Sequence, residues 1–340
     1  MTVNRELSEK IPVLSFLATC GIVLYHCDSP ANELAANAAD LWLNQQLARI
    51  FDGPIITLCL CWFFWLTGFL LFRGLSFSVL GKKLARRVRT LLVPYVLWQL
   101  LYLVKSILQG NVWTPGTAFA HIFLLRVWPP LQPFWYVYAV FLLSLLSPLL
   151  LALLRGEKSG WLAIAALMLL LYAFGSRLNI QNGHLHYILN IERYVPCYLI
   201  GAYFGRFYRD EAREKSLPYA IGFLLLGAAL DPCIERFLIF MTLSVLPLML
   251  LFYMPLPDWT KNRGLYRASF LIYATHESLI SLSRGPIQSA LYALGGSAAL
   301  TNLLGRLLCL ALVVAFNHGL RLLMARFTPK TLGLLTGGRG

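Results

Sequence analysis

A line of polar side chains crosses the first apolar segment of the chain and ends in a histidine. Ser15, Thr19 and His26 are four and seven residues apart, so at 100° per residue they share one face of a helix. Polar groups in such a segment usually face a helix-bundle interior or a wet cavity. Imidazole exchanges protons near neutral pH because its unperturbed pKa is about 6.5. His26 is therefore a candidate for proton transfer, although a histidine at the membrane edge above a helix-packing stripe would give the same pattern.

A second histidine lies in a similar setting near the other end of the chain. Ser269, Tyr273 and His276 stand at i, i+4 and i+7, again on one helix face. Two buried polar stripes favour a shared internal site, which Ser15, Thr19, Tyr273 and His276 would support. Polar groups also join membrane helices to one another, so structural pairing explains the second stripe equally well.

The third candidate feature is a basic cluster, Lys82-Lys83-Leu84-Ala85-Arg86-Arg87-Val88-Arg89, which leads into an apolar segment starting near residue 90. A helix is expected to begin here, and its free N–H groups and positive dipole end would add to an anion site. The planar fork of arginine matches phosphate oxygens two at a time. A polyphosphate ligand such as a nucleotide or coenzyme A would fit. A positively charged membrane flank in contact with anionic lipid heads is the alternative.

The composition predicts how these residues are positioned. Hydrophobic residues make up 58% of the 340 and charged residues only 13%, whereas a soluble domain carries about 25% charge. Apolar stretches long enough to cross about 30 Å of hydrocarbon recur throughout. We therefore predict an all-α, polytopic transmembrane helical bundle with about ten spans. The predicted spans are 11–27, 54–73, 90–108, 132–154, 161–176, 194–207, 217–230, 237–255, 268–283 and 302–322.

The distribution of charge predicts the orientation. The net charge is +14, and most of the 29 basic residues fall on flanks that would face one side of the membrane. Basic loops stay in the cytoplasm during insertion, so both ends are predicted to be cytoplasmic. The excess charge then has a topological origin, and no nucleic-acid partner is expected. The 7 cysteines show no Cys-x-x-Cys or zinc-type spacing, so no metal site is expected.

Six short motifs follow one another along the chain, and they are Gly21–His26, Leu66–Leu70, Arg87–Arg89 with Pro94, Trp135–Tyr136 through Pro148, Leu199–Tyr203, and Ser269 with Ile272–His276. Taken together they resemble the motifs of the acyltransferase-3 family of bacterial integral-membrane acyltransferases. Each motif alone is weak, and their order makes the set fairly specific. The resemblance spans nearly the whole chain, with an acyltransferase-3-like transmembrane domain over 1–327 and a cytoplasmic Gly-rich tail over 328–340.

The resemblance implies a mechanism and a location. His26 would be the catalytic base, and Arg87 and Arg89, with Arg86 beside them, would hold an acyl-CoA, with acetyl-CoA as the expected co-substrate and no permanently bound cofactor. The histidine would take the proton from an acceptor hydroxyl arriving from the outer side, and that oxygen would attack the thioester carbonyl. The acceptor would be an envelope polysaccharide or glycolipid, and the protein would span the bacterial cytoplasmic (inner) membrane in contact with its lipids.

One departure separates this chain from the family pattern. Family members usually carry an arginine eleven residues before the histidine, in an Asp-x-x-Arg context, whereas here Ser15 and Pro12 stand at those positions. A divergent branch or a weakened activity would follow if that arginine positions a ligand or tunes the histidine. A transporter or flippase-like protein of a polysaccharide pathway, with polar stripes lining a passage, is the alternative function, and a non-catalytic membrane scaffold is a third.

Overall fold

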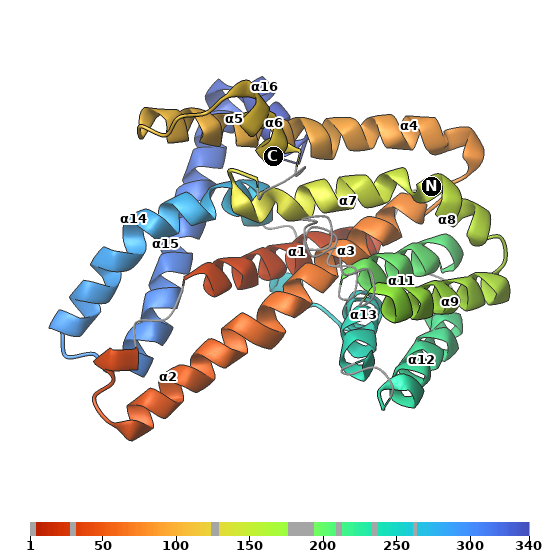
Figure 1. The fold of residues 1–340 in the computed structure, drawn as a ribbon, viewed down its shortest axis with the longest axis horizontal. Helices are drawn as coiled ribbons and strands as arrows, with labels where there is room; N and C mark the ends of the chain where they lie inside the picture. The colour runs from red at the N-terminus through yellow and green to blue at the C-terminus, as the bar shows by residue number, and fades with distance from the viewer. Residues whose placement is uncertain are drawn as a thin grey trace. The chain divides into compact units, whose positions relative to one another are not determined.

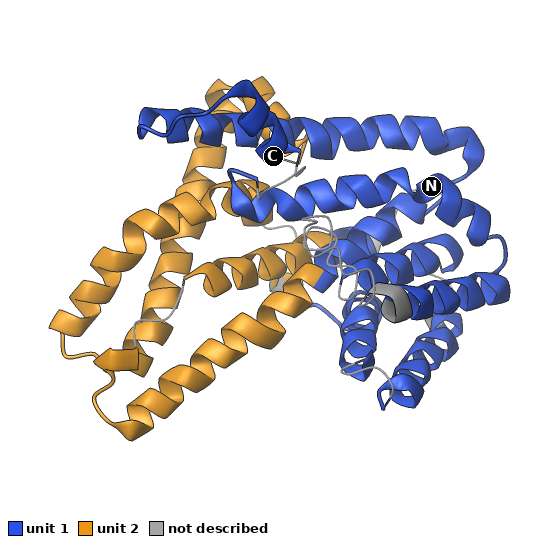
Figure 2. Ribbon diagram, viewed as in Figure 1, with its two compact units in different colours: residues 1–10, 61–257 blue, residues 11–60, 258–340 orange. Residues whose placement is uncertain are grey.

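The computed structural model describes residues 5–27, 32–123, 129–175, 194–208, 213–232, 237–260 and 264–339. Every regular element in these residues is a helix, and none of them forms a strand (Figure 1). The all-α prediction is therefore confirmed. The chain divides into two compact units, unit 1 with residues 1–10 and 61–257 and unit 2 with residues 11–60 and 258–340 (Figure 2).

Helices occupy most of the described part of each apolar segment that the sequence marks as a span. Four of them, Glu6–His26, Ala38–Phe72, Phe77–Leu108 and Ala298–Phe327, are long and apolar enough to cross a membrane. The pair Gln132–Leu145 and Ser147–Leu153 adds a fifth if this bent pair is one span. These helices are those of a membrane protein. The count of ten spans and the orientation stay predictions.

Unit 1 is built from helices in the middle of the sequence. They are most of α3 (Ile56–Phe72), α4 (Phe77–Arg87), η3 (Val88–Leu92), α5 (Val93–Leu108), α6 (Pro115–Ile122), η4 (Gln132–Phe134), α7 (Trp135–Leu145), α8 (Ser147–Leu153), α9 (Glu157–Gly175), α11 (Tyr194–Phe207), α12 (Arg213–Leu230) and α13 (Phe237–Phe252). The axis bends by 52° between α7 and α8, where Pro148 lies in the first turn of α8 and cannot continue the backbone ladder of α7.

Glycines let α3 and α11 approach backbone to backbone. A Cβ atom on Gly201 would lie 2.1 Å from the Trp65 carbonyl oxygen, and one on Gly205 would lie 2.2 Å from that of Phe69. From the other helix, a Cβ on Gly68 would lie 2.3 Å from the carbonyl oxygen of Tyr198. Small residues four apart are typical of close helix pairs in membranes. This contact fixes α3, on which the basic helix α4 is anchored.

Unit 2 combines the two ends of the sequence. Its elements are α1 (Arg5–His26) from Ile11 onward, η1 (Asn32–Leu34), α2 (Ala38–Ile50), η2 (Phe51–Ile55), the start of α3, η6 (Asp258–Thr260), η7 (Gly264–Ala268), α14 (Ser269–Ala293), α15 (Ala298–Phe327) and α16 (Pro329–Thr336). α14 continues well past the predicted end at residue 283. Within the stretch predicted as a Gly-rich tail, residues 329–336 form a helix.

The core of unit 2 joins α1, α14 and α15. Its buried residues include Val23 from α1, Ile272 and Ile280 from α14, and Cys309 and Val313 from α15. α14 packs along α15, and α2 packs against α15 as well (Figure 1). The apolar faces of these three helices pack together. The end of α1, where His26 lies, is therefore held against α14, the helix that carries His276.

Candidate functional site

The two histidines singled out in the sequence lie next to each other in unit 2. The ring centroids of His26 and His276 are 4.9 Å apart, and their planes meet at 55°. His276 is fully buried, whereas His26 is half-buried at the last residue of α1. The half-buried His26 is therefore the member of the pair that a reactant can reach, and His276 contacts it from inside the protein.

The buried ring has a defined hydrogen-bond partner on its own helix. His276 Nδ1 lies 2.7 Å from the carbonyl oxygen of Tyr273. A carbonyl oxygen can only accept, so Nδ1 carries the proton and donates it. In the neutral ring Nε2 is then an acceptor, and this atom is buried without a hydrogen-bond partner among the described residues. The backbone of α14 thus selects a tautomer of His276 that can accept a proton at Nε2.

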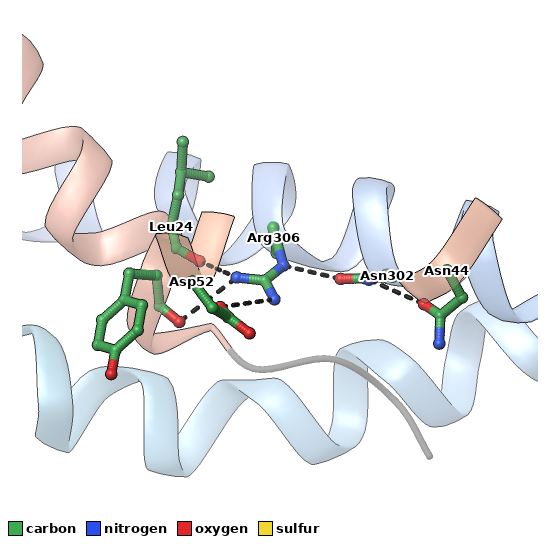
Figure 3. A network of polar contacts seen from close by, with 6 residues as sticks. Leu24, Asn44, Asp52, Asn302 and Arg306 are labelled. Carbon is green, nitrogen blue, oxygen red and sulfur yellow. Dashed lines mark hydrogen bonds and ion pairs between the residues drawn. The ribbon is translucent and has the colours of Figure 1, made fainter. Parts of the chain in front are cut away.

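The end of α1 is held by a buried arginine from α15 (Figure 3). The last carbonyls of a helix have no partner within it, and in α1 those of Leu24 and Tyr25 accept hydrogen bonds from Arg306 Nη1. The Arg306 side chain is fully buried, and its Nη2 lies 3.7 Å from Asp52 Oδ1. Its guanidinium carbon also lies 4.7 Å from the centre of the Phe51 ring. The turn that ends in His26 is therefore fixed by a charged side chain.

A chain of amides continues from this arginine toward α2. Arg306 Nε donates to Asn302 Oδ1 at 2.7 Å, and Asn302 Nδ2 donates to Asn44 Oδ1 at 2.8 Å (Figure 3). Asn302 and Arg306 are one helical turn apart on α15, so both face the same neighbours. Asn44 is fully buried and lies on α2. The position of Arg306 is thus set from α2 as well as from α15.

Thr19 and Ser269 each donate to a backbone carbonyl three or four residues earlier in the chain. Thr19 Oγ1 donates to the Ser15 carbonyl oxygen at 2.9 Å. The hydroxyl of Ser269, the first residue of α14, donates to the Tyr266 carbonyl oxygen of η7 at 2.6 Å. Tyr273 contributes its carbonyl to His276, as described above. Between the two stripes, the rings of His26 and His276 are in contact, and within α14 the ring of Tyr273 lies 6.0 Å from that of His276.

The basic cluster lies in unit 1, and the expected helix start at this cluster is wrong. The helix begins at Phe77, and residues 77–108 form one continuous helical segment with a π-helical turn at Val88–Leu92. The Val88 N–H is bonded to the carbonyls of Leu84 and Ala85. The π turn lies just before Pro94, and such turns occur where a proline interrupts the ladder. No helix N-terminus is therefore available to an anion at Arg86–Arg89.

The cluster has two faces with different contacts. Lys83 Nζ donates to the carbonyls of Leu71 at 2.8 Å and Arg73 at 2.6 Å, and Arg87 donates to that of Thr67 at 3.2 Å. These two residues attach α4 to α3. The other basic side chains are exposed, and they are Lys82, Arg86 and Arg89. Arg86 and Arg89 therefore present an exposed cationic surface, and Arg87 lies between it and the backbone of α3.

Arg306 and its partners did not emerge from the sequence. A signal was present, since an arginine in an apolar span with Asn302 one turn earlier is as unusual as a histidine there. Asn44 and Asp52 gave no such signal because they precede the second predicted span. Among the described residues no group of three or more His, Cys, Asp or Glu could hold a metal ion.

Comparison with known proteins yields one match. A family model described as an acyltransferase domain, of the acyltransferase-3 type, matches residues 11–317. The match covers far more than half of the chain and includes both histidines, the basic cluster and Arg306. No curated protein and no solved structure matches the chain.

Proposed function

Because the chain belongs to the acyltransferase-3 family, as its match over residues 11–317 shows, we propose that it is a membrane O-acyltransferase that transfers a short acyl group from coenzyme A to a hydroxyl. An acyltransferase activity in general follows from the family. The acyl group, which we take to be acetyl, and the hydroxyl acceptor are parts of the proposal.

The contact between His26 and His276 is the observation that carries this proposal. His26 is half-buried and terminates a helix, so a substrate can reach its ring. As the base, it removes the proton from the acceptor hydroxyl while that oxygen attacks the thioester carbonyl. The carbon–sulfur bond then breaks, the coenzyme A thiolate leaves, and the proton held by His26 goes to that sulfur. His276, buried behind the base, fixes the ring from the protein side.

The exposed arginines of unit 1 are the proposed anchor for the donor. Arg86 and Arg89 each present a guanidinium to solvent, which suits the phosphates of acetyl-CoA. Arg87 has a mixed role, because its guanidinium already donates to the Thr67 carbonyl. Its contribution is to hold α4 on α3 and to add charge beside its two neighbours.

The predicted topology sets the direction of transfer. With ten spans and both ends in the cytoplasm, the basic cluster faces the cytoplasm, where acetyl-CoA is made, and His26 lies toward the outer side. The acceptor is then a hydroxyl of an envelope polysaccharide or glycolipid. The proposed location is the bacterial cytoplasmic membrane, with its lipids as the surrounding partners.

The test uses inside-out membrane vesicles from cells that produce the full chain. Acetyl-CoA labelled in the acetyl group is added, and label retained in the envelope material is measured for the natural protein, for His26→Ala and for His318→Ala, another histidine in an apolar span. We expect His26→Ala to lower transfer by about 10²- to 10⁴-fold and His318→Ala to leave it close to normal. Undiminished transfer by His26→Ala at equal protein level would refute the role of His26.

The transporter alternative predicts a different result in the same vesicles. A passage lined by polar stripes would move a glycan or lipid without changing it, so no label from acetyl-CoA would appear in the product. Labelled product that depends on His26 excludes that function. Absence of label with the natural protein contradicts the proposed acetyl transfer.

A further inference from the structure

We propose that Arg306 is a positioning residue of the catalytic centre, which sets the orientation of His26 by binding the carbonyls that precede it. This inference rests on the proposed function of His26 as the base. Arg306 Nη1 donates to Leu24 and Tyr25, the two residues directly before His26 (Figure 3). Arg306 therefore acts on the helix end that presents the imidazole, and not on the imidazole itself.

The contacts of Arg306 come from three separate segments of unit 2. α1 supplies the two carbonyls, η2 supplies the Asp52 carboxylate and the Phe51 ring, and α15 supplies the amide oxygen of Asn302. A guanidinium has five N–H groups in a rigid plane and can reach several acceptors at once. A lysine ammonium has three donors at one point, so it cannot reproduce this set.

Burial of the charge is the reason to assign a role beyond packing. Removing a guanidinium from water costs several kcal/mol unless its partners compensate, and Arg306 is fully buried while Asp52 keeps 44% of its side chain exposed. A neutral apolar residue would fill the same volume at lower cost. Such a residue could not donate hydrogen bonds to the last carbonyls of α1. Without these hydrogen bonds the final turn of α1 would be free to fray. His26 is the residue that such fraying would displace.

The experiment compares three variants with a matched control on the same helix. Arg306→Gln removes the charge and most of the donors, Arg306→Lys keeps the charge, and Asn302→Ala leaves the arginine but removes the acceptor that orients its Nε. Arg321→Lys is the control, since Arg321 is also a buried arginine of α15 and lies about 22 Å further along the axis at 1.5 Å per residue. Only variants that insert and elute as the natural protein does are compared.

We expect a fall in kcat with little change in the KM for acetyl-CoA. A displacement of about 1 Å at a reacting group can cost on the order of 100-fold, so Arg306→Gln should lose about that factor. Arg306→Lys should recover part of it, and Asn302→Ala should lose less than Arg306→Gln. Arg321→Lys should leave kcat close to normal. A kcat of Arg306→Gln equal to that of the control, or a rise in KM at unchanged kcat, would overturn the proposal.

A second readout does not depend on activity. Diethyl pyrocarbonate modifies accessible histidines, and the modified peptide that contains His26 is quantified by mass spectrometry. We expect the rate at His26 to change severalfold in Arg306→Gln and to stay unchanged in Arg321→Lys. If acetyl transfer is absent in the natural protein but this rate responds to Arg306, the proposed function fails and the positioning role stands. If transfer depends on His26 while neither kcat nor the rate responds to Arg306, the positioning role fails alone.

Discussion

Asp40 accepts a hydrogen bond from the backbone N–H of Ala298, so a carboxylate from α2 closes the N-terminal end of α15. Asp40 Oδ2 lies 2.9 Å from the Ala298 nitrogen, and Oδ1 lies 2.9 Å from that of Ala299. The first N–H groups of a helix lack partners within it, and the helix dipole favours a negative charge there. This contact fixes the start of the helix that carries Arg306.

Replacing Asp40 should therefore destabilise unit 2. Asp40→Asn puts an NH₂ group where one of the two accepting oxygens faces a backbone N–H, so at least one of these bonds is lost. We expect the melting temperature of the detergent-solubilised protein to fall by several degrees. Glu33→Gln is the control, because Glu33 is an exposed carboxylate just before α2. Equal melting temperatures for the two variants would contradict the capping role.

His276→Asn tests the buried member of the histidine pair. The amide NH₂ of asparagine can donate to the Tyr273 carbonyl as Nδ1 does, but nothing replaces Nε2 beside His26. We expect acetyl transfer to fall by about 10- to 100-fold, the range produced by small displacements of a reacting group, with the melting temperature nearly unchanged.

The neighbouring residue supplies the control for His276. Thr275 Oγ1 donates to Asn317 Oδ1 at 2.9 Å and so links α14 to α15. Thr275→Val should cost about 1 kcal/mol of stability through the lost hydrogen bond and keep kcat. If Thr275→Val lowered transfer as much as His276→Asn, the effect would come from helix packing and not from the imidazole.

The sequence predicted the helices and the partner histidines for a common physical reason. The length of an apolar segment and the i, i+4, i+7 spacing of its polar residues are local properties of the sequence. Both histidines could be recognised from them, because each is an ionisable group within an apolar segment. The role of Arg306 could not be predicted in this way, because its partners come from three segments of the chain. No local pattern predicts that the carbonyls of Leu24 and Tyr25 face it. The predicted start of the third helix is too late because the apolar segment begins near residue 90, whereas a π turn at Val88–Leu92 joins that segment to the preceding charged helix α4.

Gly201→Ala should disrupt the contact between α3 and α11. The added Cβ would lie 2.1 Å from the Trp65 carbonyl oxygen, and backbone atoms on two helices cannot move aside as a side chain can. Overpacking of this kind costs about 1–3 kcal/mol, so the amount of folded protein and its melting temperature should both fall. Gly285→Ala on α14 is the control, because its Cβ would meet nothing within 4 Å. A normal melting temperature for Gly201→Ala would refute the close approach.

The exposed face of the basic cluster should govern affinity for the donor and not the rate of chemistry. Arg86 and Arg89 are exposed, whereas Arg87 also anchors α4 on α3, so the clean test is Arg86→Gln combined with Arg89→Gln. A hydrogen bond to a charged group is worth about 1.5–3 kcal/mol, which is tenfold or more in affinity per contact. Loss of binding shared by ground state and transition state raises KM and leaves kcat unchanged.

We therefore expect the KM for acetyl-CoA to rise at least tenfold in the double variant. The KM of the natural protein should also depend more steeply on salt concentration than that of the double variant. Arg326→Gln, an exposed arginine near the end of α15, should change neither value. Should the double variant keep a normal KM, the phosphates of the donor bind elsewhere and the cluster acts as a membrane flank in contact with anionic lipids.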